Sequence, residues 1–192
     1  MTLQGWLDGW QDLHGVAPSP LVRRWLVLVH RLGSPLARTG VHPDVLTFLS
    51  LVSAGAVLLV PSWAGVLLVV LSSGLDGLDG CVAVLQQRAS RRGYVLDSTV
   101  DRCCDVLFVV AMVRVGGPLE VGAAGGFAVL LLEYIRARAG EVLVVTIAER
   151  PVRVLVTVFA LALDQGAVGL WVLTGLTAAG LLQLGAAVRR VT

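Results

Sequence analysis

The 192-residue sequence is poor in charge and contains no lysine. Charged side chains make up 15% of it and aromatic side chains make up 6%. Its positive charge comes from fifteen arginines. Hydrophobic residues reach 56%, and the mean hydropathy is +0.84. A soluble domain carries about 25% charged residues and is only about half apolar. The composition therefore excludes an ordinary soluble domain and predicts an integral membrane protein with one domain.

Cysteine and histidine are also scarce. The three cysteines lie in apolar segments without CxxC spacing, and the three histidines share no helix face. This excludes a Cys/His metal site, and the cysteines are interpreted as small buried apolar residues. The N-terminal segment, residues 1–18, lacks the basic and apolar regions of a signal peptide. Its leucines and tryptophans recur at helical spacing and predict a short helix on the membrane or on the protein itself.

Six apolar segments predict an all-α, polytopic membrane protein with six transmembrane helices. They cover about residues 45–60, 63–85, 94–115, 119–137, 152–163 and 167–188. The arginines give the expected orientation, because basic residues accumulate on the cytoplasmic side of a membrane. With both termini cytoplasmic, Arg102 lies within the third span, and Arg114 is the only other arginine that does not fall on the cytoplasmic side. We expect a multi-pass protein of the plasma membrane.

The region before the first span contains an amphipathic helix with the sequence PLVRRWLVLVHRL. Its leucines, valines and tryptophan form an apolar face, and Arg23, Arg24, His30 and Arg31 form a basic face. This pattern is typical of a helix in the headgroup layer of an anionic leaflet, with a partner-binding helix as the alternative. The chain thus divides into an N-terminal segment (1–18), this juxtamembrane helix with its linker (19–40), and a six-helix domain (41–192).

Four aspartates interrupt the apolar pattern. Asp76 and Asp79 are spaced i, i+3 near the end of the second span, and Asp97 and Asp101 are spaced i, i+4 near the start of the third. Such spacings place each pair on one helix face, and the two antiparallel spans bring both pairs to the cytoplasmic side. Asp105 lies one turn deeper than Asp101. Carboxylates are costly in a bilayer, so this cluster needs a compensating positive charge.

Divalent metal ions would supply that charge. Oxygen ligands suit Mg²⁺, Mn²⁺ or Ca²⁺, and two such ions held by four carboxylates support phosphoryl transfer. Gly77 and Gly80 flank Asp79 and leave the backbone open to a phosphorylated ligand, and Gly93 lies where the loop enters the third span. The ion path of a transporter and a purely structural set of caps and salt bridges are the alternatives. The position at one membrane face, away from the midplane, favours an enzyme.

These residues resemble the signature of the CDP-alcohol phosphatidyltransferase family, D-x2-D-G-x2-A-R-x8-G-x3-D-x3-D. The matching positions, with every gap intact, are Asp76, Asp79, Gly80, Ala83, Gly93, Asp97 and Asp101. One position departs, because Val84 stands where the family has an arginine of the donor site. Arg88, expected one turn further along the same helix face, is the candidate replacement. The departure leaves a catalytically inactive, lipid-binding relative as an alternative.

Further motifs resemble the actinobacterial phosphatidylinositol-phosphate synthase branch of the family, with phosphatidylglycerophosphate synthases close behind. They are LDSTVDRCCD, EYIRARAGE and AERPVR, whereas HPD followed by Thr47 resembles the opening of the first span in the family as a whole. The resemblance implies a pocket for a phosphorylated polyol lined by Arg102, Arg136, Arg138, Arg150 and Arg153. Clustered arginines offer forked donors to a phosphate dianion. The positive-inside rule alone would also explain arginines at four of these positions. Arg102 is the exception, because it lies inside the predicted third span.

The same resemblance implies a reaction, a cofactor and an assembly. CDP-diacylglycerol would donate its phosphatidyl group to inositol phosphate, to glycerol phosphate or to another alcohol, and CMP would leave. The donor would lie against Gly77, Gly80, Ala83, Arg88 and Gly93. Two Mg²⁺ or Mn²⁺ ions would be held by Asp76, Asp79, Asp97 and Asp101, with Asp101 also serving as the base. A homodimer without a nucleic-acid partner is implied, and Gly122-x3-Gly126 fits either a dimer seam or an internal helix contact.

Overall fold

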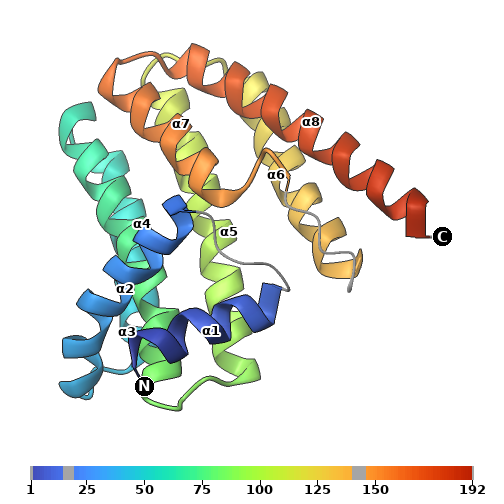
Figure 1. The fold of residues 1–192 in the computed structure, drawn as a ribbon. Helices are drawn as coiled ribbons and strands as arrows, with labels where there is room; N and C mark the ends of the chain where they lie inside the picture. Colours follow the sequence, from blue (N-terminus) through green and yellow to red (C-terminus); the bar gives the residue numbers. More distant parts are fainter. Residues whose placement is uncertain (1, 15–19, 140–145, 192) are drawn as a thin grey trace. The chain divides into compact units, whose positions relative to one another are not determined.

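The computed structural model describes residues 2–14, 20–139 and 146–191, and within them every regular element is a helix (Figure 1). This confirms the all-α prediction. The helices, in chain order, are α1 (Leu3–His14), α2 (Pro20–Arg38), α3 (Pro43–Ala56) with the 3-10 turn η1 (Val57–Leu59), α4 (Ser62–Leu85), α5 (Arg91–Arg114), α6 (Leu119–Ala139), α7 (Arg150–Ala162) and α8 (Gly166–Val191).

Each of the six predicted apolar segments coincides with a helix from α3 to α8. Turn chemistry separates them. Pro61 stands between η1 and α4, while Gly116 and Asp164 adopt left-handed backbone conformations, with φ of 91° and 53°, after α5 and α7. Among the described residues, two helices are long and apolar enough to cross a membrane, Ser62–Leu85 and Gly166–Arg189, whereas Pro43–Leu59 is apolar but shorter. The six helices are therefore confirmed, and six membrane crossings stay a prediction.

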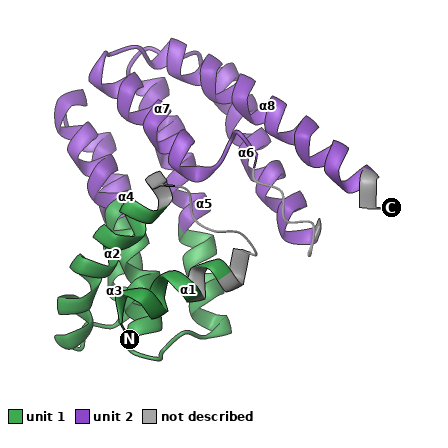
Figure 2. Cartoon of the chain, viewed as in Figure 1, with its two compact units in different colours: residues 1–50, 73–100 green, residues 51–72, 101–192 purple. Residues whose placement is uncertain are grey.

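The chain separates into two compact units (Figure 2). Unit 1 contains residues 1–50 and 73–100, and unit 2 contains residues 51–72 and 101–192. Helices α4 and α5 each begin in one unit and continue, without a break, into the other. The separation of two positions along α4, or along α5, therefore follows from the rise per residue of a continuous α-helix.

Close packing of α2 on α4 organises unit 1. A Cβ atom at Gly33 of α2 would lie 2.8 Å from the Cys81 sulfur, and one at Gly77 of α4 would lie 3.0 Å from the Trp25 ring. Glycine is thus required at both positions for this approach. The predicted amphipathic helix is confirmed, because α2 buries Leu26 and Val29 and exposes its basic side chains, Arg23, Arg24 and Arg31. Helix α1 packs against α2.

Helices α6 and α7 pack on α8 in unit 2. The core there is formed by Val109, Met112, Val129, Ala160, Leu170 and Leu173. A Cβ atom at Gly122 would lie 2.8 Å from Val113, and one at Gly126 would lie 3.8 Å from Val109, both on α5. The predicted Gly-x3-Gly motif therefore serves an internal contact between α5 and α6, which was one of its two expected uses.

Candidate metal centre and arginine cluster

Two of the predicted metal ligands approach one another in unit 1. Asp76 of α4 and Asp97 of α5 each offer a carboxylate oxygen, and these oxygens lie within 4.8 Å of one another. Asp101 follows Asp97 by one turn of the same helix, so it belongs to the same helix face. Together the three partly buried carboxylates form a group that could hold a metal ion. An all-oxygen set of this kind suits a hard divalent cation.

The fourth predicted ligand, Asp79, is buried at 3% exposure and stands in a different environment. Its Oδ2 accepts a hydrogen bond from the hydroxyl of Thr47, a buried residue of α3, and its Oδ1 accepts from the backbone N–H of Gly80. In the sequence, Thr47 belongs to the motif that begins with HPD, and that motif does not link it to Asp79. Its contact with Asp79 spans 32 positions and depends on how α3 packs, so spacing could not reveal it.

The glycines near the aspartates differ in their surroundings. A Cβ atom at Gly80 would meet nothing within 4 Å, so the backbone there is open, as expected for a ligand-facing position. At Gly77, Trp25 already occupies the space assigned in the sequence to a phosphorylated ligand. Gly93 lies in the first turn of α5, where its N–H donates to the Ser90 hydroxyl. Ser90 therefore acts as the N-cap of that helix.

The expectation that Arg88 lies one turn beyond Val84 on the same helix face is wrong. Helix α4 ends at Leu85, and Gln87 has a left-handed backbone with φ of 56°. The Arg88 N–H donates to the Ala83 carbonyl over 2.8 Å and closes the helix end, as expected for a left-handed C-terminal cap. Arg88 is an exposed loop residue, and helical spacing does not relate it to Val84, which is 41% exposed.

An arginine cluster in unit 2 gathers around Glu133 of α6. The Glu133 carboxylate accepts hydrogen bonds from Arg102 at 3.3 Å, Arg136 at 3.1 Å and Arg153 at 3.0 Å. Its side chain is only 10% exposed. One buried negative charge therefore holds three guanidinium groups from α5, α6 and α7. The signal in the sequence was a glutamate three residues before an arginine in an otherwise apolar helix.

The predicted substrate arginines are not equally accessible. Arg153 is buried at 6% side-chain exposure and also donates to Asp105 at 2.9 Å and to the Ala148 carbonyl at 2.6 Å. Arg102 and Arg136 keep 33% and 26% of their side chains exposed. Arg136 also donates to Glu149 and to Thr146, each over 2.9 Å. The cluster thus has a buried member, whose two terminal nitrogens both donate hydrogen bonds, and two members that remain within reach of solvent.

Two other predicted substrate residues occupy separate positions. Arg150 of α7 forms an ion pair with Asp101, and Arg102 approaches the same carboxylate at 3.8 Å. Within unit 2, Asp101 therefore belongs both to the set of predicted metal ligands and to the surroundings of the arginine cluster. Arg138 is exposed and lies over the Tyr134 ring, 5.7 Å from its centroid. This contact is a typical cation–π arrangement at a surface.

Comparisons with known proteins identify the family. A family model described as CDP-alcohol phosphatidyltransferase matches residues 40–184. An archaetidylinositol phosphate synthase of Aeropyrum pernix is 38% identical over 116 residues, which are 56% of this chain and 57% of that protein. A phosphatidylinositol phosphate synthase of Cutibacterium acnes is 31% identical over 152 residues, which are 71% of this chain and 73% of that protein.

A bifunctional IPC transferase and DIPP synthase of Rubrobacter xylanophilus is 37% identical over 111 residues. That match covers 54% of this chain but only 25% of the Rubrobacter protein. The chain therefore spans little more than half the length of the Aeropyrum relative and a quarter of the Rubrobacter relative.

Proposed function

Because the chain belongs to the CDP-alcohol phosphatidyltransferase family, we propose that it transfers a phosphatidyl group from CDP-diacylglycerol to inositol phosphate and releases CMP. The observation that carries this proposal is the contact of Asp101 with Arg150 and Arg102. It joins a carboxylate of the candidate metal group to a cluster of phosphate-binding side chains. The names of the Aeropyrum and Cutibacterium relatives support an inositol phosphate acceptor.

The acceptor phosphate binds, in this proposal, to the accessible part of the arginine cluster. Arg102 and Arg136 retain exposed guanidinium surface, and forked N–H donors match a phosphate dianion. Arg150 completes the site from α7, and Arg138 extends it at the surface. Arg153 acts indirectly, because its donors are directed to Glu133, Asp105 and Ala148. It holds the Glu133 carboxylate that orients the others.

Two Mg²⁺ or Mn²⁺ ions would be held by Asp76, Asp79, Asp97 and Asp101, and would neutralise the diphosphate of the donor. Asp101 accepts the proton of the acceptor hydroxyl as the hydroxyl oxygen bonds to the lipid-side phosphorus. The bond from that phosphorus to the CMP oxygen breaks, and CMP leaves. Thr47 keeps the Asp79 carboxylate oriented, while the open face of Gly80 admits the phosphorylated ligand.

We also propose that α3 to α8 all cross the plasma membrane, with both termini and the site on the cytoplasmic side. The two long apolar helices and the one-sided distribution of arginines support this orientation. The donor would then enter sideways from the bilayer. Assembly as a homodimer is part of the same proposal, although Gly122 and Gly126 are already used within the chain.

The decisive experiment is a CMP-release assay with purified protein, CDP-diacylglycerol and Mn²⁺ or Mg²⁺. Inositol phosphate is expected to support release far better than glycerol 3-phosphate, and chelation of the metal should stop it. Asp97→Asn and Asp101→Asn should each reduce the rate by at least about 100-fold, as expected for loss of metal-ion catalysis. Unchanged release by both variants would refute the metal assignment, and a preference for glycerol 3-phosphate would refute the acceptor.

A second candidate is a catalytically inactive, lipid-binding relative. Val84 favours it, because the family signature has arginine there and Arg88 does not continue the same helix face. The same assay separates the two candidates. An inactive relative would release no CMP with any acceptor, yet would still bind CDP-diacylglycerol in a direct binding measurement.

A further inference from the structure

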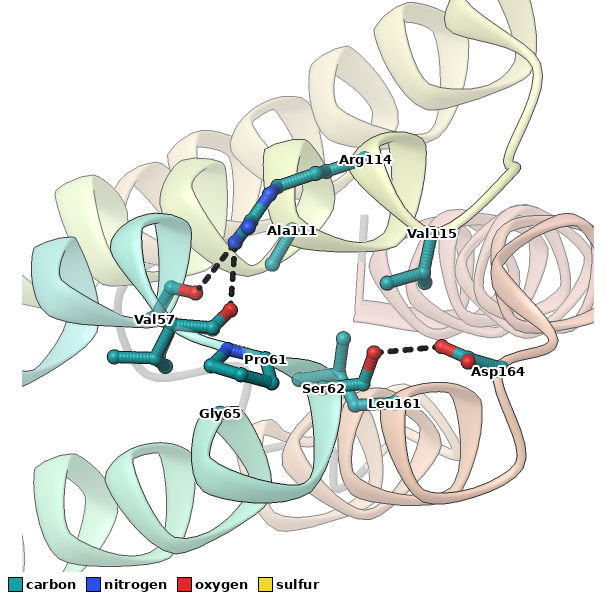
Figure 3. Close-up of a pocket in the computed structure, with 10 residues that line it drawn as sticks. Val57, Pro61, Ser62, Gly65, Ala111, Arg114, Val115, Leu161 and Asp164 are labelled. Atoms are coloured by element: carbon teal, nitrogen blue, oxygen red, sulfur yellow. Dashed lines mark hydrogen bonds between the residues drawn. The ribbon is translucent and has the colours of Figure 1, made fainter.

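A cavity lies at the start of α4 and the end of α5, remote along both helices from the aspartates (Figure 3). Its volume is about 440 Å³, and it is lined by residues of unit 2 alone, from η1, the start of α4, the end of α5 and the end of α7. Ser62 at its edge precedes Asp76 by fourteen residues of α4, which is about 20 Å of helix. The cavity is therefore not part of the proposed active site.

Two charged side chains of opposite sign line this cavity. Arg114 reaches from α5 to the end of η1, where its Nη1 donates to the carbonyls of Val57 and Val60 over 3.2 and 2.8 Å. Asp164 accepts a hydrogen bond from the Ser62 hydroxyl over 2.6 Å. Both of these hydrogen bonds of Arg114 use one nitrogen, whereas a guanidinium carries five N–H donors. Each charged group therefore retains capacity for a ligand.

The position of Arg114 is unexpected from topology. Two arginines, Arg102 and Arg114, do not fall on the predicted cytoplasmic side. Arg102 contacts Asp101 of the proposed active site, so only Arg114 is left without an explanation. Asp164 ends α7 in a left-handed backbone conformation, which aspartate and asparagine both tolerate, so the turn explains a short polar residue there but not its charge. The positive-inside rule does not account for Arg114, and turn preference does not account for a negative charge at position 164. A ligand with one negative and one positive group would account for both.

The surroundings indicate that the ligand is a lipid. Three large apolar residues that are sequence neighbours of the cavity lining are strongly exposed. They are Leu59 of η1 (83%), Trp63 of α4 (71%) and Leu163 after α7 (66%). Exposed leucines suit acyl chains, and tryptophan prefers the boundary between headgroups and chains. A cavity of several hundred Å³ is large enough for a headgroup.

We propose that this cavity binds the headgroup of an aminophospholipid from the leaflet opposite the active site. The lipid phosphate accepts hydrogen bonds from Arg114, the protonated amine pairs with Asp164, and the acyl chains lie against the exposed apolar side chains. The proposal does not depend on the transferase activity, because none of these residues belongs to the carboxylate group or to the arginine cluster.

The test is native mass spectrometry of the full chain, incubated in detergent with equimolar phosphatidylethanolamine and phosphatidylglycerol of identical acyl chains. The unmodified protein should retain phosphatidylethanolamine about threefold more than phosphatidylglycerol, the factor that one partly exposed ion pair supplies. Asp164→Asn should abolish this preference. Asparagine keeps an acceptor for Ser62 and suits the left-handed conformation, so misfolding would not explain the loss.

Two further arms complete the test. Arg114→Gln should lower retention of both lipids, because it removes the phosphate partner. Free phosphoethanolamine, at the concentration of the lipid, should not displace it. No preference in the unmodified protein, or an undiminished preference in Asp164→Asn, would overturn the proposal. Displacement by free phosphoethanolamine would overturn the lipid as the occupant.

Discussion

At the scale of single residues, Glu133 is the carboxylate that links three arginines in the described part of unit 2. Its carboxylate binds three arginines at once, and Glu149 holds one of the same arginines from the other side. Long arginine side chains lose much conformational entropy when they are fixed in place. Glu133 therefore acts as a positioning residue, which keeps Arg102 and Arg136 ready for an acceptor phosphate.

Glu133→Gln should raise the KM for inositol phosphate about tenfold and leave the KM for CDP-diacylglycerol unchanged. The amide removes the negative charge and leaves buried guanidinium donors unsatisfied, which costs about 1–3 kcal/mol. Steady-state CMP release at varied concentrations of each substrate measures both constants. Glu149→Gln is the matched control, because the Glu149 carboxylate binds one arginine of the cluster, Arg136, where Glu133 binds three, so its effect should be smaller. Equal rises in both KM values would contradict the positioning role.

At the scale of helices, hydrophobic runs and turn residues were enough to predict α3 to α8. Pro61, the glycines before Pro118 and the Asp164 turn mark boundaries that depend on local chemistry. Contacts between helices were not predictable in this way. The approach of Thr47 to Asp79 and of Trp25 to Gly77 depends on the rotation of one helix against another. Spacing within a helix placed Asp97 and Asp101 on one face, but it did not reveal the separate surroundings of Asp79, and it misplaced Arg88, because the helix ends first.

The contact between α2 and α4 offers a test at the same scale. Gly33→Ala should destabilise the protein by about 1–3 kcal/mol through overpacking, since its Cβ would lie 2.8 Å from the Cys81 sulfur. The gain in helix propensity, about 1 kcal/mol, offsets part of this cost. Thermal unfolding in detergent measures the change.

The control for that contact is Gly74→Ala on α4, where a Cβ atom would meet nothing within 4 Å. It should leave the melting temperature unchanged or raise it, because alanine favours the helix. Cys81→Ala should cost less in the Gly33→Ala background than alone, since it removes the crowded sulfur. Additive effects of the two substitutions would show that Gly33 and Cys81 do not meet.

At the scale of the whole molecule, the chemistry divides between the two ends of α4 and α5. The carboxylates lie near the end of α4 that joins the 86–90 loop, and the Arg114–Asp164 cavity lies near the opposite ends. Spanning helices would separate these features by a bilayer. The proposed donor site then faces one aqueous phase, and the proposed headgroup cavity faces the other.

Labelling with a membrane-impermeant maleimide tests this sidedness. In a background without the three native cysteines, Ala89→Cys should react only after the cells are permeabilised, and Gln165→Cys should react in intact cells. Both positions are exposed, one between α4 and α5 and the other between α7 and α8, so reagent access depends only on the side of the membrane. The arginines beside Ala89 require the cytoplasmic side by the positive-inside rule. Labelling of Ala89→Cys in intact cells would reverse the orientation, and equal labelling of both positions in intact cells would place the two ends of the helices on one side.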